Sequence, residues 1–588
     1  MLSDGIKAVM GERPFDLLIR HVRIVNVYTD TVSDGSIGIV DGRIVYAGEM
    51  DFSCRARETI EGGGRYALPG FVDAHMHLES SMLTPSHFAS AVLPCGTTTV
   101  AADPHEIANV LGREGVEALM RAARGLPLRV LVMAPSTVPS APGFEDSGYA
   151  VDAGEMEQLL ALPGIAGLGE VMDFNGVAAG EERILSVVET AARRGFLLDG
   201  HASVLTGRRL QAFRAAGIDS DHTVYSAEKL NEELALGFTV EIQSCMLSEE
   251  MAKVMNDAPL QNRICLVTDD VPLPRLMHEG HLNAVVAKAV SLGLSPLRAI
   301  RYATVNPAER LRLYDVGGIA PGMAADLQLV EDLCHPRPTL VICGGRKVYE
   351  NGIFLTELPP LPPSEALQHS VNMRPVASEE FLVSCPVSEL FQGGTAVVNM
   401  IHQDGIGVHT KRVQRELPLR PAEFGRAVAD TAPYLKMAVF NRYGRPQRGL
   451  ALIDGMEHVT GAAALTYGHD SHNLTVFGGN DSDMVLAANT VREAEGGLCA
   501  VSGGCVKALI PLPLAGLLCE EEPQVLLSKL DAFLDACRAM GFCHADLMAF
   551  FTIMPLAVSP EIKCTDLGLL DVTHKRFLPL IERVKENA

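Results

Sequence analysis

Between residues 67 and 270, short apolar runs alternate with segments that repeat apolar residues at helical spacing. The strand-like runs cover residues 67–77, 97–103, 128–133, 165–171, 196–201, 217–222, 238–243 and 263–269. The clearest helical segments between them cover residues 85–92, 110–124, 181–194 and 208–216. Eight such strand and helix pairs predict an α/β fold, a (β/α)8 barrel of the TIM type. Barrels of this type place their chemistry at the C-terminal ends of the strands.

A two-residue alternation, typical of half-buried strands, flanks this region on both sides. It covers residues 16–66, where Asp41-Gly42 is a strong hairpin signal, and it returns at 326–330 and 340–349. Neither flank is large enough to form a stable sheet alone. We infer that residues 1–66 and 318–356 fold together as a small β-sandwich around a barrel of residues 67–317.

A proline-rich stretch at 356–363 cannot hold a helix or a central strand, and it predicts a linker. Strand-like runs at 396–401 and 437–440 follow it, with helical patterns at 484–495 and 525–540. These patterns predict a separate C-terminal α/β domain over residues 364–588.

Composition narrows the classes of protein. The 588 residues exceed what one compact core usually holds, so two or three domains are expected. The net charge of -23 argues against a nucleic acid or an anionic membrane as partner. The thirteen cysteines include no CxxC pair, which favours a reducing compartment. No leader pattern and no membrane-length apolar span is visible, so we expect a soluble cytoplasmic protein.

Polar residues end several of the predicted barrel strands. His75 and His77 are two positions apart in one strand, so their side chains point the same way. The polar residues at the strand ends are His75 and His77, then Asp103, His105 and Glu106, then Glu170, His201, His222 and the pair Asp269-Asp270. Four of the histidines (His75, His77, His201 and His222) and two carboxylates could bind metal. Imidazole and carboxylate groups in this arrangement suit a two-metal hydrolytic site, in which a bridging water becomes acidic. The strand-eight carboxylate would then act as general base.

Each of these residues also has a simpler interpretation. A single histidine at a strand end is more often a hydrogen-bonded polar residue than a ligand. Glu170 could pair with an arginine, and Asp269-Asp270 could cap the following helix. Six coincidences at the correct ends of the correct strands are much harder to accept, so we favour the metal site.

Several motifs resemble known proteins. Pro69–His77 resembles the strand-one motif of the amidohydrolase superfamily, and Gly318–Asp326 is similar to a motif that accompanies it. Four longer stretches resemble the adenine deaminase family: His77–Met82, Gly96–Val110, Gly167–Met172 and Ser220–His222. Two stretches in the tail, Gly468–Asn473 and Leu512–Leu517, resemble the C-terminal domain of that family.

This resemblance implies the hydrolytic deamination of adenine to hypoxanthine and ammonia, a reaction of purine salvage or catabolism. It implies a purine base as the small-molecule partner and a homo-oligomer, expected to be a dimer. It also implies two bound divalent metal ions, manganese or iron, with zinc also compatible with the ligands. The ligands that it implies are His75, His77, Glu170, His201, His222 and Asp269. Asp269 would carry a proton to the ring or to the departing amine, and Asp270 is the alternative carboxylate. Glu170 differs from the modified lysine that hydantoinase-like relatives carry on strand four.

His105 and Glu106 follow the second predicted strand. We include them with Asp269 as candidate catalytic residues, either as contacts to the purine ring or as a further metal position. The alternative is a structural pair at a helix start. His77 and Glu79 form an H-x-E fragment of another zinc deaminase class, but the required P-C-x-x-C partner is missing.

His469 and His472 lie in a polar turn of the predicted tail domain. They could form a second site or belong to a loop that reaches toward the barrel mouth. The favoured interpretation is a turn held by its own Asp and Asn side chains.

The sequence also departs from the family at three places near the expected pocket. Ile242–Cys245 replaces an Arg-Glu-Gly run, Ser203 replaces a proline, and Thr223 replaces a glutamate. The alternative function is therefore a binuclear amidohydrolase that acts on another heterocyclic amine or cyclic amide. A non-catalytic barrel that keeps metals for structure is disfavoured, because a structural site needs neither an open position nor a base.

Overall fold

The computed structural model of the chain describes residues 2–50, 55–257, 261–362, 364–388, 390–405 and 409–586. They form two compact units. We call the first the barrel unit; it contains Met1–Pro104, Leu119–Thr137 and Asp152–Pro362. The second, the tail unit, contains His105–Ala118, Val138–Val151 and Pro363–Ala588. Among the described residues, none of the helices combines the length and the apolar character needed to span a bilayer.

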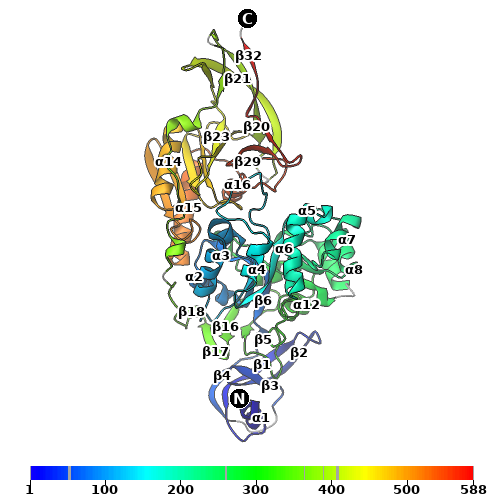
Figure 1. Ribbon diagram of the computed structural model, residues 1–588. Coiled ribbons are helices and arrows are strands. Elements are labelled where there is room, and N and C mark those ends of the chain that lie inside the picture. The colour runs from blue at the N-terminus through cyan, green and yellow to red at the C-terminus, as the bar shows by residue number, and fades with distance from the viewer. Residues whose placement is uncertain are drawn as a thin grey trace. The chain divides into compact units, whose positions relative to one another are not determined.

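The centre of the barrel unit consists of short parallel strands in two sheets, and Figure 1 labels β6 among them. These strands are β6 (Phe71–His77), β7 (Thr97–Ala102), β8 (Arg129–Ala134), β9 (Ile165–Val171), β10 (Leu197–Gly200), β11 (Ser220–Asp221), β12 (Thr239–Ile242), β13 (Ile264–Leu266) and β14 (Asp269–Asp270). One sheet has the order β10-β9-β8-β7-β6-β14, and another has the order β11-β12-β13. The predicted eighth strand is thus divided into β13 and β14, and β14 pairs with β6. The predicted barrel fold is confirmed.

Helices follow most of the strands, as the sequence pattern predicts. They are α2 (Pro85–Val92), α3 (His105–Ala122), α4 (Ala153–Leu159), α5 (Phe174–Ala179), α6 (Glu182–Arg193), α7 (Gly207–Ala215), α8 (Ala227–Ala235), α9 (Glu249–Asp257), α10 (Leu273–His278), α11 (Leu282–Ser291), α12 (Pro296–Tyr302) and α13 (Val305–Arg310). One boundary differs, since α3 begins at His105 rather than at Val110. Pro104 immediately precedes the helix, and the acidic Glu106 in the first turn interacts favourably with the helix dipole.

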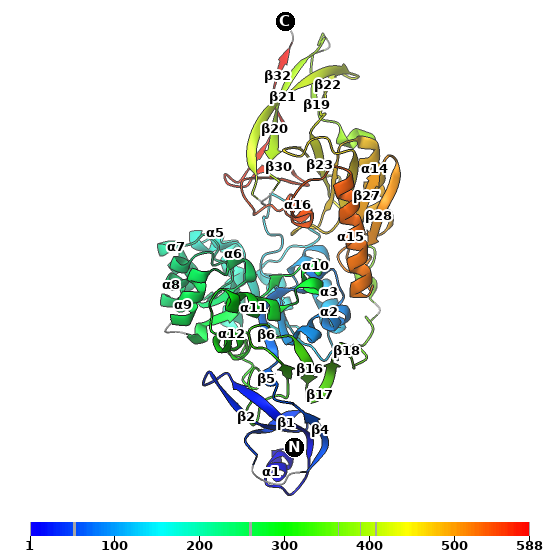
Figure 2. The ribbon, with the colours of Figure 1, turned by 180° about the vertical axis from the view of Figure 1, so that it is seen from behind.

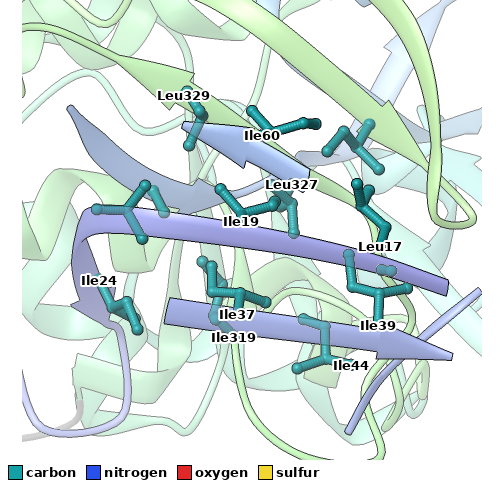
Figure 3. Packing of buried hydrophobic residues seen from close by; sticks show 14 of the residues in the cluster. Leu17, Ile19, Ile24, Ile37, Ile39, Ile44, Ile60, Ile319, Leu327 and Leu329 are labelled. Atoms are coloured by element: carbon teal, nitrogen blue, oxygen red, sulfur yellow. The ribbon is translucent and has the colours of Figure 1, made fainter. Parts of the chain in front are cut away.

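The two flanks of the barrel contribute to one nine-stranded sheet. The first flank supplies β1 (Phe15–Asn26), β2 (Thr31–Val40), β3 (Arg43–Gly48), β4 (Ala56–Glu61) and β5 (Tyr66–Pro69), after α1 (Leu2–Val9). The second supplies β15 (Leu327–Val330), β16 (Pro338–Cys343), β17 (Arg346–Glu350) and β18 (Ile353–Phe354). The antiparallel pair β5 and β15 joins the flanks. Alternate apolar residues such as Leu17, Ile19 and Ile37 meet in one core (Figure 3). The predicted linker has no helix or strand over residues 356–362, and Pro363 lies outside the described residues.

The tail unit contains an 11-stranded sheet with helices, as expected for an α/β domain. Its strands are β19 (Ser384–Pro386), β20 (Gly394–His402), β21 (Lys411–Ala422), β22 (Arg426–Ala429), β23 (Leu435–Phe440), β24 (Arg448–Asp454), β25 (Gly461–Leu465), β26 (Leu474–Gly478), β27 (Gly497–Ser502), β28 (Cys505–Pro511) and β32 (Ile581–Glu586). Helices α14 (Asp481–Glu493) and α15 (Pro523–Ala539) pack against β25, β27 and β28 (Figure 2). A shorter sheet, β29 (Ile562–Thr565), β30 (Gly568–Asp571) and β31 (Arg576–Leu578), and helix α16 (Leu547–Ile553) complete it.

Candidate metal centre

The six residues at the strand ends meet within the barrel unit. Strand β6 is buried along its whole length, and its two-residue period puts His75 and His77 on the same face. The groups of donor atoms close enough to share an ion include His75 with His77 and Glu170, His75 with His222 and Asp269, and Glu170 with His201 and His222. All six residues that the sequence indicated as ligands therefore lie around one centre.

Glu170, at the end of β9, lies between two groups of histidines. Its Oε1 atom is 3.2 Å from Nε2 of His77. Its Oε2 atom is 2.6 Å from Nδ1 of His201 and 3.3 Å from Nε2 of His222. One oxygen therefore faces the β6 histidines and the other faces the histidines after β10 and β11. This is the arrangement that a carboxylate bridging two ions requires.

Asp269 completes the first group. Its Oδ1 atom is 3.1 Å from Nε2 of His77 and 3.5 Å from Nε2 of His75. The residue has a positive φ of 57°, a left-handed conformation that Asp tolerates better than most residues. The neighbouring Asp270 accepts a hydrogen bond from the hydroxyl of Ser80. These contacts favour Asp269 as the carboxylate that faces both β6 histidines.

The outer nitrogens of the β6 histidines have oxygen partners that fix their tautomers. Nδ1 of His75 is 2.7 Å from Oδ2 of Asp199, and Nδ1 of His77 is 2.9 Å from the carbonyl oxygen of Asp103. Because a carbonyl oxygen can only accept, Nδ1 of His77 carries a proton. In a neutral ring, Nε2 then presents its lone pair to the centre. Carboxylate and carbonyl partners of this kind are common behind metal-bound histidines.

Mutual electrostatics explain the pKa values in the centre. Burial alone lowers the pKa of His75, but Asp199, Asp269 and Glu170 together raise it well above its ordinary value. Burial likewise raises the pKa of Glu170, but the surrounding histidines hold it well below its usual range. The histidines and carboxylates of the centre therefore stabilise each other's charged forms.

The donor set fits divalent ions. Nε2 of His75 is buried and has no hydrogen-bond partner in the described part of the chain, which suits a ligand atom. The rings of His75 and His222 stack with centroids 3.8 Å apart. A histidine of β6 and a histidine that follows β11 therefore lie side by side. Imidazole suits zinc and iron, and carboxylates extend the choice to manganese. The residues present could hold a pair of first-row divalent ions.

Two of the three departures from the family pattern, Ser203 and Thr223, bond to each other, and the third contacts His222 through Gln243. The hydroxyl of Thr223 accepts a hydrogen bond from the Ser203 amide at 2.7 Å and donates one to Asp221 at 2.6 Å. The amide of Gln243 donates to the carbonyl of His222 at 3.0 Å. The substituted residues thus connect the segments that carry the two histidines.

His105 and Glu106 belong to the tail unit, in the first turn of α3. Glu106 contacts His469 and His472 there. Asn473 bonds to Ser471 within the turn, as the favoured interpretation expects, and also to the carbonyl of Asp146. The contacts of both histidines with Glu106 go beyond that interpretation. The catalytic role of His105 and Glu106 stays a prediction.

Asp199 is the residue that our sequence reasoning missed. It lies in β10 within the run Leu197-Leu-Asp-Gly-His201, where a buried acidic residue stands among apolar ones. That contrast was the available signal. Only the three-dimensional structure shows that its partner is His75, which is far away in the sequence.

Comparison with known proteins gives near full-length matches. The amidohydrolase family model matches residues 66–348, and the model of the adenine deaminase C-terminal domain matches residues 407–576. An adenine deaminase of Nitratidesulfovibrio vulgaris is 35% identical, over 98% of this chain and 98% of its own. Adenine deaminase 2 of Rhizobium etli is 37% identical, over 98% and 96% of the two chains. An adenine deaminase of Halalkalibacterium halodurans is 36% identical, over 96% and 95%.

Proposed function

The chain belongs to the adenine deaminase family, and we propose that it catalyses the hydrolytic deamination of adenine to hypoxanthine and ammonia. The observation that carries the hydrolytic chemistry is the convergence of four imidazoles and two carboxylates at the strand ends. The choice of adenine as the substrate rests on the relatives, which match along almost the whole chain.

We assign the six residues to two overlapping metal positions. His75, His77 and Asp269 would hold one ion, and His201 with His222 would hold the other. Glu170 would bridge them, because its two oxygens face the two groups separately. A bound pair of divalent ions would lower the pKa of a water molecule and stabilise negative charge at the reacting carbon.

Asp269 would accept and donate the proton during the reaction. Its carboxylate is charged, because the histidines around it hold its pKa well below the usual range even though burial opposes this. It could therefore accept a proton from the attacking water and return it to the ring nitrogen or to the departing amine. The oxygen of water would bond to C6 of adenine, the C6–N bond would break, and ammonia would leave.

The second candidate substrate class, another heterocyclic amine or a cyclic amide, is favoured by one observation. Ser203, Thr223 and Gln243 depart from the family pattern and connect the segments that carry His201 and His222. These departures leave the proposed ligands unchanged, so they affect the substrate more than the type of reaction.

The test is ammonia release from adenine, adenosine, other 6-substituted purines and cyclic amides. Full-length protein loaded with manganese is compared with protein treated with a chelator. We expect turnover of adenine that depends on the metal. Failure on adenine with turnover of another ring would replace the substrate and keep the chemistry, whereas failure on every ring with metal bound would overturn the proposal.

A matched pair of variants tests the proton carrier. Asp269→Asn should lower kcat by roughly 10²- to 10⁴-fold at saturating metal, the usual contribution of a general base. Asp270→Asn should change kcat much less, because Asp270 bonds to Ser80. The opposite order of effects would assign the role to Asp270.

We further propose manganese or iron as the native metal, with zinc as the alternative, since imidazole and carboxylate ligands accept all three. Metal analysis of protein from unsupplemented cells tests this choice. The described cysteines are all free thiols, which supports a reducing cytoplasm. The dimer implied by the family can be tested by light scattering.

A further inference from the structure

A second cluster of histidines and carboxylates lies entirely within the tail unit. His105 and Glu106 come from the first turn of α3, and the turn between β25 and β26 supplies His469, Asp470 and His472. The side chains of Glu106 and His472 are completely buried, and that of Asp470 is 5% exposed. The steps of the proposed deamination assign no role to this cluster, and a further metal position is one of the two roles that the sequence predicts for His105 and Glu106.

We propose that His105, Glu106, His469 and Asp470 bind a divalent metal ion in the tail unit. Nε2 of His105 is 3.7 Å from Oε1 of Glu106 and 3.9 Å from Oδ1 of Asp470. Nδ1 of His469 is 3.7 Å from the same Asp470 oxygen. Two ligand atoms at about 2.1 Å from one ion lie about 3.4 Å apart at a tetrahedral angle, and further apart at wider angles. These three spacings suit a shared ion.

The fourth contact is closer than this spacing. Nδ1 of His469 and Oε1 of Glu106 touch directly, and an ion between them would separate the two side chains slightly. Oε1 is buried, and the imidazole of His469 is its partner in the described part of the chain. A buried carboxylate oxygen needs a donor or a cation, and an ion would take the place of this direct contact.

His472 positions Glu106 and leaves its other oxygen for the ion. The Gly468 amide donates to Nδ1 of His472 at 3.2 Å, so this nitrogen is not protonated. The ring proton of the neutral imidazole is then on Nε2, which donates to Oε2 of Glu106. Because both nitrogens of His472 are used in this way, it orients the carboxylate and is not itself a ligand.

The cluster brings two buried carboxylates together, since the side chain of Glu106 is fully buried and that of Asp470 is 5% exposed. A divalent ion held by both would stabilise their negative charges.

The chemistry of the ligands narrows the ion and its role. Imidazole nitrogens with carboxylate oxygens suit zinc or manganese among the first-row metals. Four protein ligands with no open position are typical of a structural site rather than a catalytic one. The bound ion would connect the first turn of α3 to the turn between β25 and β26. These two segments are far apart in the sequence, since Glu106 and His472 are 366 positions apart.

The test is metal content of the full-length protein after loading with Zn²⁺ and removal of free ion. His469→Asn should bind one ion per chain fewer than the unmodified protein. His402→Asn is the matched control, since His402 pairs with one carboxylate of the same unit, Asp454. It should leave the content unchanged. This difference does not depend on how many ions the barrel holds, so failure here is distinct from failure of the proposed deamination.

Equal metal content in His469→Asn and unmodified protein would overturn the proposal. If His469→Asn does not fold, anomalous diffraction from Zn²⁺-loaded crystals of the unmodified protein decides the question. A zinc peak at about 2.1 Å from Nε2 of His105 and Nδ1 of His469 would support the site. The lack of a peak there, in crystals that show zinc elsewhere, would overturn it.

Discussion

Replacing Asp199 by Asn tests whether the carboxylate behind His75 strengthens metal binding. Oδ2 of Asp199 is 2.7 Å from Nδ1 of His75, and both side chains are buried. The asparagine oxygen can still accept the Nδ1 proton, so the ring orientation is kept. The amide is a weaker acceptor than a carboxylate, however, and it no longer increases the basicity of Nε2.

The size of the effect follows from this geometry. Loss of an outer partner of a metal-bound histidine typically weakens metal affinity by about 10- to 100-fold. This corresponds to about 1.4 to 2.7 kcal/mol of binding free energy. The loss should fall on the ion held by His75. Binding of the ion at the other position should change little.

The assay is a competitive titration of metal-free protein with Mn²⁺ and a coloured chelator. Asp219→Asn is the matched control, because Asp219 pairs with Arg310 at 3.2 Å as Asp199 does at 4.0 Å. Unchanged affinity in Asp199→Asn would refute the reasoning about His75. An equal loss in both variants would show that the effect acts through Arg310 and the fold.

Three further outcomes follow from the centre and its surroundings. Removing the metal with a chelator should lower the free energy of unfolding by about 2.7 kcal/mol, relative to protein in which the free metal concentration is about a hundred times Kd. An unchanged Tm would contradict this. Without metal, the raised pKa values of His75 and His77 stabilise the fold at low pH, and this contribution is lost as pH rises through them. The Tm of metal-free protein should therefore fall above about pH 6.5, whereas metal-loaded protein should show the reverse, because protons compete with the ions. Lys229→Met should cost about 3 to 5 kcal/mol in urea unfolding, because the buried carboxylate of Asp221, 2.9 Å from the ammonium, would lose its cationic partner and keep only neutral donors such as Thr223. A loss below about 1 kcal/mol would mean that this pair behaves like a surface pair.

The barrel and the six candidate ligands could be predicted because both depend on short-range patterns. Each ligand follows an apolar run, and parallel strands in a barrel bring their C-terminal ends to one rim. No knowledge of long-range pairing was needed to expect His75 near Glu170 or Asp269. The eighth strand was predicted as one run, but it divides into β13 and β14, and β14 pairs with β6.

Contacts that no periodicity encodes could not be predicted. The helical pattern of α3 is clear only from Val110, so the position of His105 and Glu106 at a helix start was only one of two interpretations. Glu106 meets His472 across 366 positions of sequence, and neither residue belongs to a repeat that points to the other. Local turn chemistry was therefore the simplest interpretation of the tail histidines, and the structure adds a long-range contact to it.

The pKa values indicate how the barrel centre is kept intact without its ions. In the metal-free protein, protonated His75 and His77 place positive charge beside Glu170 and Asp269, as bound ions would. Metal binding then becomes an exchange of protons for ions among side chains that already face the centre. Because the carboxylates that raise the histidine pKa values are the same ones that would bind the metal, affinity and proton release are linked. Asp199 takes part in both, since it raises the pKa of His75 without facing the ions.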